Sequence, residues 1–285
     1  MNLTRSKKKD LLYVAVAAFF FLTACVLQTV DDYISDWSVK KTIALLTQYI
    51  FFGLLAYWTA SVISRISDKS ICSGIIVAIA LMGVILFVRL LKYHVFYDGT
   101  VMRYLWYSYY IPHCLAPAVL LITLLGMGRK DGKPLAKGWY LLFLPAAALI
   151  LLVFTNDLHE QVFSFAKGLK YSNETYKWEW GYYFILSWIA VLYLSIGVLL
   201  YIKCRVSGCR KKAWIPLVLF IVCIVLCVLR EVFDPVFIRM PEAVVFSVVV
   251  VFESLIRIGF IPSNVNHEEL FYVADVSAGI ADKDL

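Results

Sequence analysis

The sequence has few charged residues for its length. Only 16% of its 285 residues are Asp, Glu, Lys or Arg, whereas 62% are hydrophobic and the mean hydropathy is +0.79. A typical soluble domain is roughly half apolar and about a quarter charged. The chain has too little polar surface to coat a globule of this size in water, which excludes a soluble enzyme and a disordered regulator.

Catalytic sequence patterns are also missing. The chain has no P-loop, no dinucleotide-binding glycine pattern, no HExxH and no GxSxG motif. Its seven cysteines are odd in number and most lie within apolar runs, so they do not suggest a disulfide framework. Cys204 and Cys209 lack the further ligands that a zinc site needs. We therefore expect no catalytic residue, no metal site and no cofactor.

Long apolar runs dominate what is present. Each is close to the roughly 20 residues that a membrane-spanning helix needs. Backbone amides in hydrocarbon must be satisfied internally, so these runs should be helices. We predict an all-α integral membrane protein, a bundle of eight transmembrane helices at residues 11–30, 42–64, 71–93, 105–127, 139–155, 181–202, 214–233 and 241–260.

Basic residues are distributed unevenly between the connecting segments. The terminal segments and alternate loops on one side hold 16 Lys and Arg, and the loops on the other side hold 7. The side richer in basic residues should face the cytoplasm, so both termini should lie inside. This pattern accounts for the net charge of +7 without any nucleic-acid partner.

The first apolar run has a second interpretation. A basic segment before an apolar stretch is typical of a secretory signal, and residues 22–25 (LTAC) resemble a lipoprotein cleavage box ending at Cys25. The apolar run continues to Val30, which favours an uncleaved helix. Cleavage at the box would leave seven helices.

Ionisable residues inside predicted spans are costly and are functional candidates by default. Glu253 and Arg257 are four residues apart near the inner end of the last span, so they should share one helix face and pair. This pair is also a candidate signal relay to whatever follows the bundle. Arg89 and Lys92 should extend toward the lipid headgroups.

His113 lies between Pro112 and Pro117, where proline should bend the helix and free backbone carbonyls. It is either a packed core histidine or, if it lines a cavity, a proton sensor.

Further polar residues gather at the predicted outer ends of the fourth, fifth and seventh spans. Bundle packing could bring them together as a ligand site, with His113 below, or they could simply cap helix ends. They are Arg103, Asn156, Asp157, His159, Arg230, Glu231 and Asp234.

Aromatic residues are concentrated at the same end, and they form either an interfacial belt or the wall of a ligand pocket. They are Tyr104, Trp106, Tyr107, Tyr109, Tyr110, Tyr176, Trp178, Trp180, Tyr182 and Tyr183.

Residues 155–159 (TNDLH), at the end of the fifth apolar run, resemble a motif of the N-terminal seven-transmembrane sensor region of bacterial histidine kinases. The family commonly has Thr-Asn-Pro-Leu-His there, and Asp157 stands where proline is usual. Residues 111–112 (IP) with 120–126 (LLITLLG) are similar to the family's third helix. Residues 258–264 (IGFIPSN) are similar to the exit from its last helix. The resemblance covers residues 42 to about 264.

The resemblance implies three parts: residues 1–41 as an extra helix with its flanks, 42–260 as the sensor-like domain, and 261–285 as a tail or the start of a PAS-like linker. It implies a sensory input module of a two-component system in the bacterial cytoplasmic membrane, acting as a homodimer. A small-molecule or membrane stimulus would be relayed through the last helix to a cytoplasmic kinase or PAS-like output, in the same chain or in a partner. Carried over to this chain, Asn156 and His159 mark a position rather than a known chemistry.

Two other functions remain open at this stage. A small-solute transporter or channel would need a polar path through the middle of the bundle, where polar residues are sparse. A membrane enzyme acting on lipid would use His113, His159 and Asp157 as acid and base groups, but they lack an HxxxD or HExxH spacing.

Overall fold

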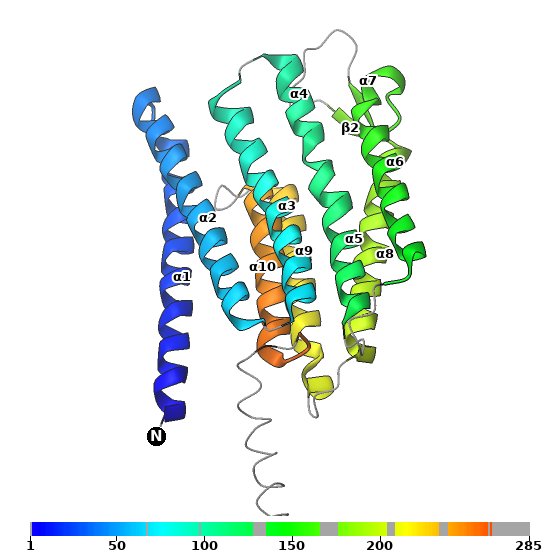
Figure 1. Ribbon diagram of the computed structural model, residues 1–285. Coiled ribbons are helices and arrows are strands. Elements are labelled where there is room, and N and C mark those ends of the chain that lie inside the picture. Colours follow the sequence, from blue (N-terminus) through cyan, green and yellow to red (C-terminus); the bar gives the residue numbers. More distant parts are fainter. Residues whose placement is uncertain are drawn as a thin grey trace, which may run out of the picture.

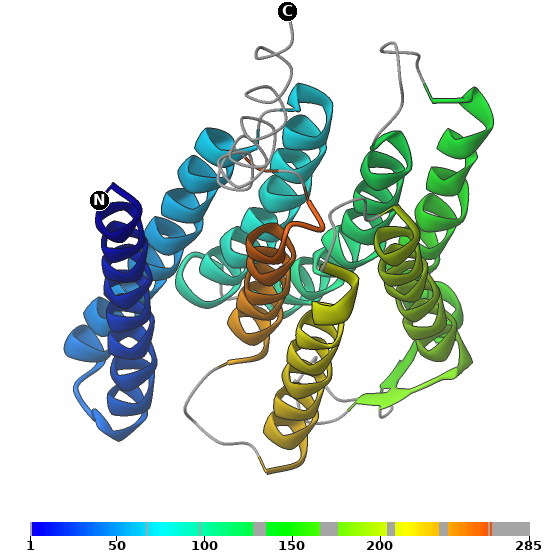
Figure 2. The same ribbon diagram turned by 90° about the horizontal axis from the view of Figure 1, so that it is seen from below.

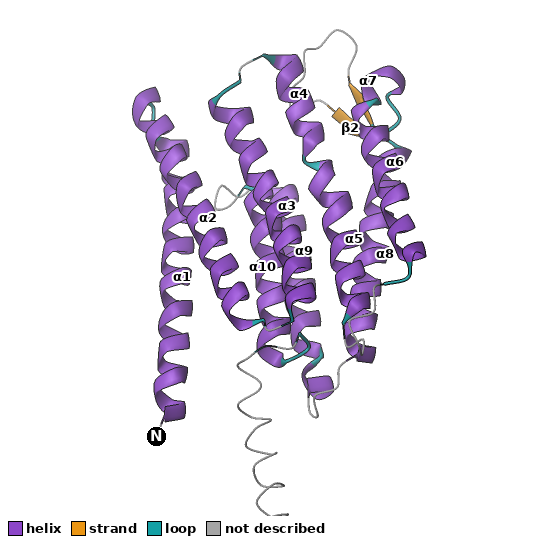
Figure 3. Ribbon diagram, viewed as in Figure 1, coloured by secondary structure: helices purple, strands orange, loops and turns teal. Residues whose placement is uncertain are grey.

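The computed structural model describes residues 2–66, 68–96, 98–127, 135–165, 176–203, 209–233, 239–261 and 263; the side chains of residues 2–11, 32, 209–210, 224, 227–228 and 230–233 fall outside this description. Within these limits the chain is a bundle of long helices with one small two-stranded sheet (Figure 1, Figure 3). The helix and strand bounds are α1 Asn2–Tyr33, α2 Trp37–Arg65, α3 Lys69–His94, α4 Gly99–Ser108, α5 Tyr110–Gly126, η2 Lys137–Leu142, α6 Phe143–Phe154, α7 Asn156–His159, β1 Phe163–Phe165, β2 Tyr176–Trp178, α8 Trp180–Lys203, η3 Cys209–Lys212, α9 Trp214–Phe233 and α10 Met240–Ile258.

Every predicted apolar run forms helix, and six helical segments are long and apolar enough to cross a membrane: Leu12–Asp31, Trp37–Arg65, Lys69–His94, Gly99–Gly126, Lys137–Phe154 and Trp180–Lys203. The all-α prediction is thus confirmed at the level of a helical, membrane-type bundle. The count of eight spans is not confirmed. Among the described residues, α9 and α10 form helices that do not meet the length and composition expected of a membrane span. The sheet of β1 and β2 was not predicted.

Aspartates start three of the long helices. The side chains of Asp36, Asp68 and Asp98 each accept two backbone amide hydrogen bonds in the first turn of α2, α3 and α4. These bonds satisfy amides that have no partner within the helix. Only three or four residues separate α1 from α2, α2 from α3 and α3 from α4, so neighbouring helices run antiparallel.

The middle of the bundle is built around α3, which packs against α2, α4, α5 and α10. Its contact with α5 is especially close at Gly74, where a Cβ atom would overlap the side chain of Thr123. Small residues let helix backbones approach in this way within membranes. Figure 2 shows α9 against α10, while α8 lies on the side of α5 and α6.

The two ends of the bundle differ. One end, called here the sheet end, carries α7, β1, β2 and the short α1–α2 and α3–α4 connections (Figure 1). The opposite end carries the α2–α3 connection and the last turn of α10. A second, aromatic-rich core lies near the sheet end, around Tyr107 and Phe163.

Candidate functional site

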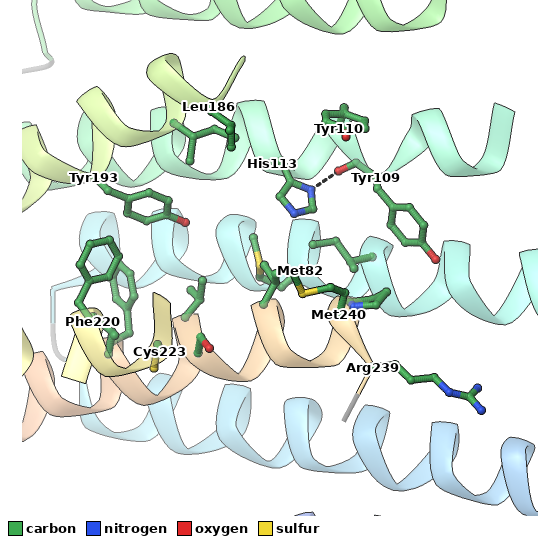
Figure 4. A pocket seen from close by; sticks show the side chains of 18 of the residues that line it. Met82, Tyr109, Tyr110, His113, Leu186, Tyr193, Phe220, Cys223, Arg239 and Met240 are labelled. Carbon is green, nitrogen blue, oxygen red and sulfur yellow. Dashed lines mark hydrogen bonds between the residues drawn. The ribbon is translucent and has the colours of Figure 1, made fainter. Parts of the chain in front are cut away.

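A long cavity of about 2230 Å³ runs between the helices. It extends from the sheet end, where Lys40 and Arg239 line it, to Trp214 and Phe260 toward the opposite end. Its walls come mainly from α2, α3, α8, α9 and α10, and α5 adds Tyr110 and His113 (Figure 4). Small-molecule sites usually enclose about 300–1,000 Å³, so this cavity could hold a ligand much larger than a metabolite.

Two ion pairs join helices at the sheet end of this cavity. Arg89 of α3 pairs with Glu242 of α10, and both side chains are almost fully buried. Arg239, which precedes α10, pairs with Asp31 of α1 at 3.0 Å. Both pairs connect the start of α10 to helices much earlier in the chain. The prediction that Arg89 and Lys92 extend to the headgroups is wrong, because both are buried, at 5% and 2% exposure.

Arg103, Asp157 and Tyr107 form a hydrogen-bonded cluster beside the sheet. The Arg103 Nη2 atom lies 2.8 Å from Asp157 Oδ2, and the Tyr107 hydroxyl donates to Asp157 Oδ1 at 2.7 Å. Of the polar residues that bundle packing could bring together at this end, Arg103 and Asp157 therefore lie in direct contact. None of these three residues lines the long cavity.

Asn156 is fully buried and holds the chain before β1 in place. Its Oδ1 atom accepts from the backbone amides of Val162 and Phe163, at 2.9 and 3.0 Å. Its Nδ2 atom donates to the Phe163 carbonyl at 2.9 Å and to the Tyr107 hydroxyl at 3.2 Å. These contacts give Asn156 a structural role: it fixes the turn that follows α7.

Replacing Asn156 with alanine should destabilise the protein by about 2–4 kcal/mol, because two buried backbone amides lose their acceptor. His159→Ala is the control. Within the described part of the chain, His159 bonds only in its own turn, to Thr155 and the Gln161 amide, so its loss should cost below about 1 kcal/mol. Thermal unfolding of the purified chain in detergent, followed by circular dichroism, measures both. Equal losses would show that Asn156 does not anchor this turn.

The structure gives less information on the other three residues predicted to gather at this end, Arg230, Glu231 and Asp234. Arg230 and Glu231 belong to α9, which packs on α10, and their side chains fall outside the description. Asp234 lies outside the described residues. The proposed gathering of these three with Asn156 and His159 therefore stays a prediction.

His113 lines the cavity from α5 (Figure 4). The predicted fourth span is broken at Tyr109 into α4 and α5, just before Pro112. Proline lacks an amide proton, so it cannot continue the helical hydrogen-bond ladder. The Tyr109 carbonyl accepts a hydrogen bond from His113 Nδ1, and since a carbonyl only accepts, this nitrogen carries a proton. Of the two interpretations, the cavity-lining one matches the placement, whereas proton sensing stays a prediction.

The aromatic residues at the sheet end divide between both interpretations. Trp180 is 54% exposed and lies outside the cavity, as an interfacial anchor would. Trp106 instead lines the cavity and packs on Phe163 and Tyr176, with ring centroids 4.4 and 4.8 Å away. The others that line it are Tyr109, Tyr110, Tyr176, Trp178, Tyr182 and Tyr183. An aromatic wall therefore borders the charged end of the cavity.

Glu253 links α10 to α2 at the opposite end. The predicted pair with Arg257 is confirmed, at 2.6 Å. Arg65 of α2 adds two further bonds to the same carboxylate, at 2.8 and 2.6 Å, and the Trp58 indole donates to it at 3.0 Å. The helical spacing could reveal Arg257 alone, because Arg65 and Trp58 are about 190 residues away in sequence and meet Glu253 only through packing.

Sequence reasoning also missed Glu242 and Asp31 as the partners of Arg89 and Arg239. The available signal was an unexplained charge, Arg89, within an apolar run, with no local carboxylate to match it. Among the residues whose side chains the structure describes, no three His, Cys, Asp or Glu groups gather as metal ligands.

Comparison of the chain with protein-family models, with curated proteins and with solved structures finds no match. The function must therefore be argued from the site.

Proposed function

We propose that this chain is a membrane-embedded sensory input module, in which a ligand in the long cavity shifts the last helix and so signals to a cytoplasmic output. The observation that carries the proposal is the position of α10. It forms part of the cavity wall through Val244, Val248 and Phe252. It is also held by ion pairs at both ends, through Glu242 and Glu253.

Such a helix can couple a site to an output. A ligand that fits the cavity better in one position of α10 than in another would shift the balance between them, and typical coupling energies are about 1–3 kcal/mol. The Glu253 carboxylate, which binds Arg65, Trp58 and Arg257, would transmit that shift at the opposite end. The resemblance of residues 155–159 and 258–264 to the sensor region of histidine kinases supports the same function, with an output in this polypeptide or in a partner.

Partly filling the cavity should change signalling without removing any charge. Gly197 of α8 lines the cavity, and a Cβ atom placed on it meets no other atom within 4 Å. We expect Gly197→Leu, in this chain fused to a histidine kinase output, to shift basal kinase activity about fivefold or more, the lower end of typical coupling. Gly53→Leu on α2 is the matched control, since Gly53 has equal space but lies outside the cavity. Autophosphorylation in membrane vesicles measures both, and an unchanged Gly197→Leu fusion contradicts the proposal.

A small-solute transporter is the second candidate, and the length of the cavity favours it. Lining residues run from the sheet end to Phe260, so a solute could travel most of the bundle. If the chain is a transporter, proteoliposomes that carry it in their membrane should take up an anionic solute. Uptake that Gly197→Leu blocks would replace the sensor proposal.

A further inference from the structure

The charged lining residues at the sheet end of the cavity are strongly biased toward one sign. Among the described residues, Asp31 is the one carboxylate that lines the cavity there. The Glu242 carboxylate forms an ion pair with Arg89 and does not line the cavity. The lining cations are Lys40, Lys41, Arg89, Lys92 and Arg239. Glu242 offsets Arg89 and Asp31 offsets Arg239, so in the part of the chain that the structure describes the five cations exceed their paired carboxylates by three, and this excess of positive charge favours an anion.

A buried hydroxyl group points to a ligand in the same region. Tyr109 is 9% exposed and lines the cavity, and its hydroxyl has no hydrogen-bond partner among the described residues. Figure 4 shows Tyr109 and Arg239 at the same end of the cavity. Buried hydroxyl groups are ordinarily hydrogen-bonded. An anionic group bound beside Arg239 would supply the missing acceptor.

The rest of the cavity is mainly apolar and reaches the outer surface of the bundle. Leu194 and Val198 of α8 and Leu217 of α9 line it, yet each is more than half exposed, at 66%, 59% and 58%. The two helices meet at Tyr193 and Phe220, whose ring centroids are 6.0 Å apart. The cavity therefore has a side opening along α8 and α9 through which an acyl chain could enter from the bilayer.

From these observations we propose that the cavity binds one anionic phospholipid. Its phosphate lies at the sheet end among Arg89, Lys92, Arg239 and the Tyr109 hydroxyl, and its acyl chains lie along α8, α9 and α10. The side opening argues for a membrane lipid rather than a dissolved anion. The proposal rests on the proposed function, because the lipid is the ligand whose presence would bias α10.

Native mass spectrometry of the full chain in detergent tests the proposal directly. Dioleoyl phosphatidylglycerol should bind as one molecule about tenfold more tightly than dioleoyl phosphatidylcholine, the gain expected from one or two charge-assisted hydrogen bonds. Arg239→Gln should lower the affinity for phosphatidylglycerol about tenfold, and Tyr109→Phe should lower it a few-fold. Glycerol phosphate, which has the anionic group without acyl chains, should not compete.

Two further variants separate a binding role from a structural one. Asp31→Asn breaks the same ion pair as Arg239→Gln but removes a negative charge, so phosphatidylglycerol binding should be unchanged or stronger. Lys137→Gln removes an exposed cation at the opposite end, outside the cavity, and should have no effect. Equal binding of the two lipids overturns the proposal, as does the same loss in Asp31→Asn as in Arg239→Gln. Competition by glycerol phosphate overturns it in favour of a soluble anion.

The outcomes also separate this proposal from the proposed function. Selective phosphatidylglycerol binding with no response of the kinase fusion to Gly197→Leu would keep the lipid site and remove the sensor function. A responsive fusion without lipid selectivity would do the reverse.

Discussion

Replacing Glu242 with leucine should destabilise the protein by about 3–5 kcal/mol, the usual cost of leaving one buried charge without its partner. Glu242 is fully buried and Arg89 is 5% exposed, so water reaches the guanidinium that remains only poorly, from the cavity side. Unfolding of the purified chain, titrated with sodium dodecyl sulfate and followed by circular dichroism, measures the loss.

The double variant Arg89→Met with Glu242→Leu supplies the control. Buried ion pairs replaced by apolar residues of similar volume are often neutral or stabilising, so the double variant should recover stability to within about 1 kcal/mol of the unmodified chain. A double variant as unstable as Glu242→Leu alone would show that volume, and not charge, sets the effect. The double variant should also bind phosphatidylglycerol less tightly, because the phosphate loses its contact with the Arg89 guanidinium.

Replacing Arg65 with alanine should destabilise the protein by about 2–3 kcal/mol, below the cost for a fully buried pair because the Arg65 side chain is 16% exposed. It makes two hydrogen bonds to Glu253 across the interface between α2 and α10. In the kinase fusion, Gly197→Leu should no longer change basal kinase activity when Arg65→Ala is also present. The reason is that the last turn of α10 would no longer be held to α2.

Arg257→Ala is the matched control for Arg65. It removes a second arginine from the same carboxylate, but its side chain is 47% exposed and the pair lies within one helix. Exposed pairs four residues apart contribute about 0.3–0.5 kcal/mol. The same denaturant titration compares the two variants. Similar losses for Arg65→Ala and Arg257→Ala would mean that the contact between α2 and α10 contributes nothing beyond an ordinary surface pair.

Local patterns were enough to predict much of this fold. Apolar runs of about 20 residues predicted the helices, because hydrocarbon leaves a backbone few other ways to satisfy its hydrogen bonds. The spacing of Glu253 and Arg257 predicted their pair, since residues four apart share a helix face. Pro112 predicted an irregularity in the fourth run, which is the break at Tyr109, whereas Pro117 lies within α5.

The site was predicted less well, because its residues come from distant parts of the chain. The sequence marked Arg89 as an unusual charge, but nothing local indicates that Glu242, about 150 residues later, lies beside it. Asn156 and Asp157 were candidates either for a ligand site or for helix capping, whereas their contacts are with Tyr107, Arg103 and the backbone around the start of β1.

The sequence by itself therefore determined where the helices of this protein lie along the chain and their apolar, membrane-type character, since hydropathy and backbone satisfaction are properties of single segments. Only the tertiary structure decided which charges pair, which helices line the cavity and which aromatic residues border it. Those features depend on how each helix is rotated about its own axis and on which helices are its neighbours. An apolar helix surrounded by lipid shows almost the same sequence on every face, and packing alone selects the side that turns inward.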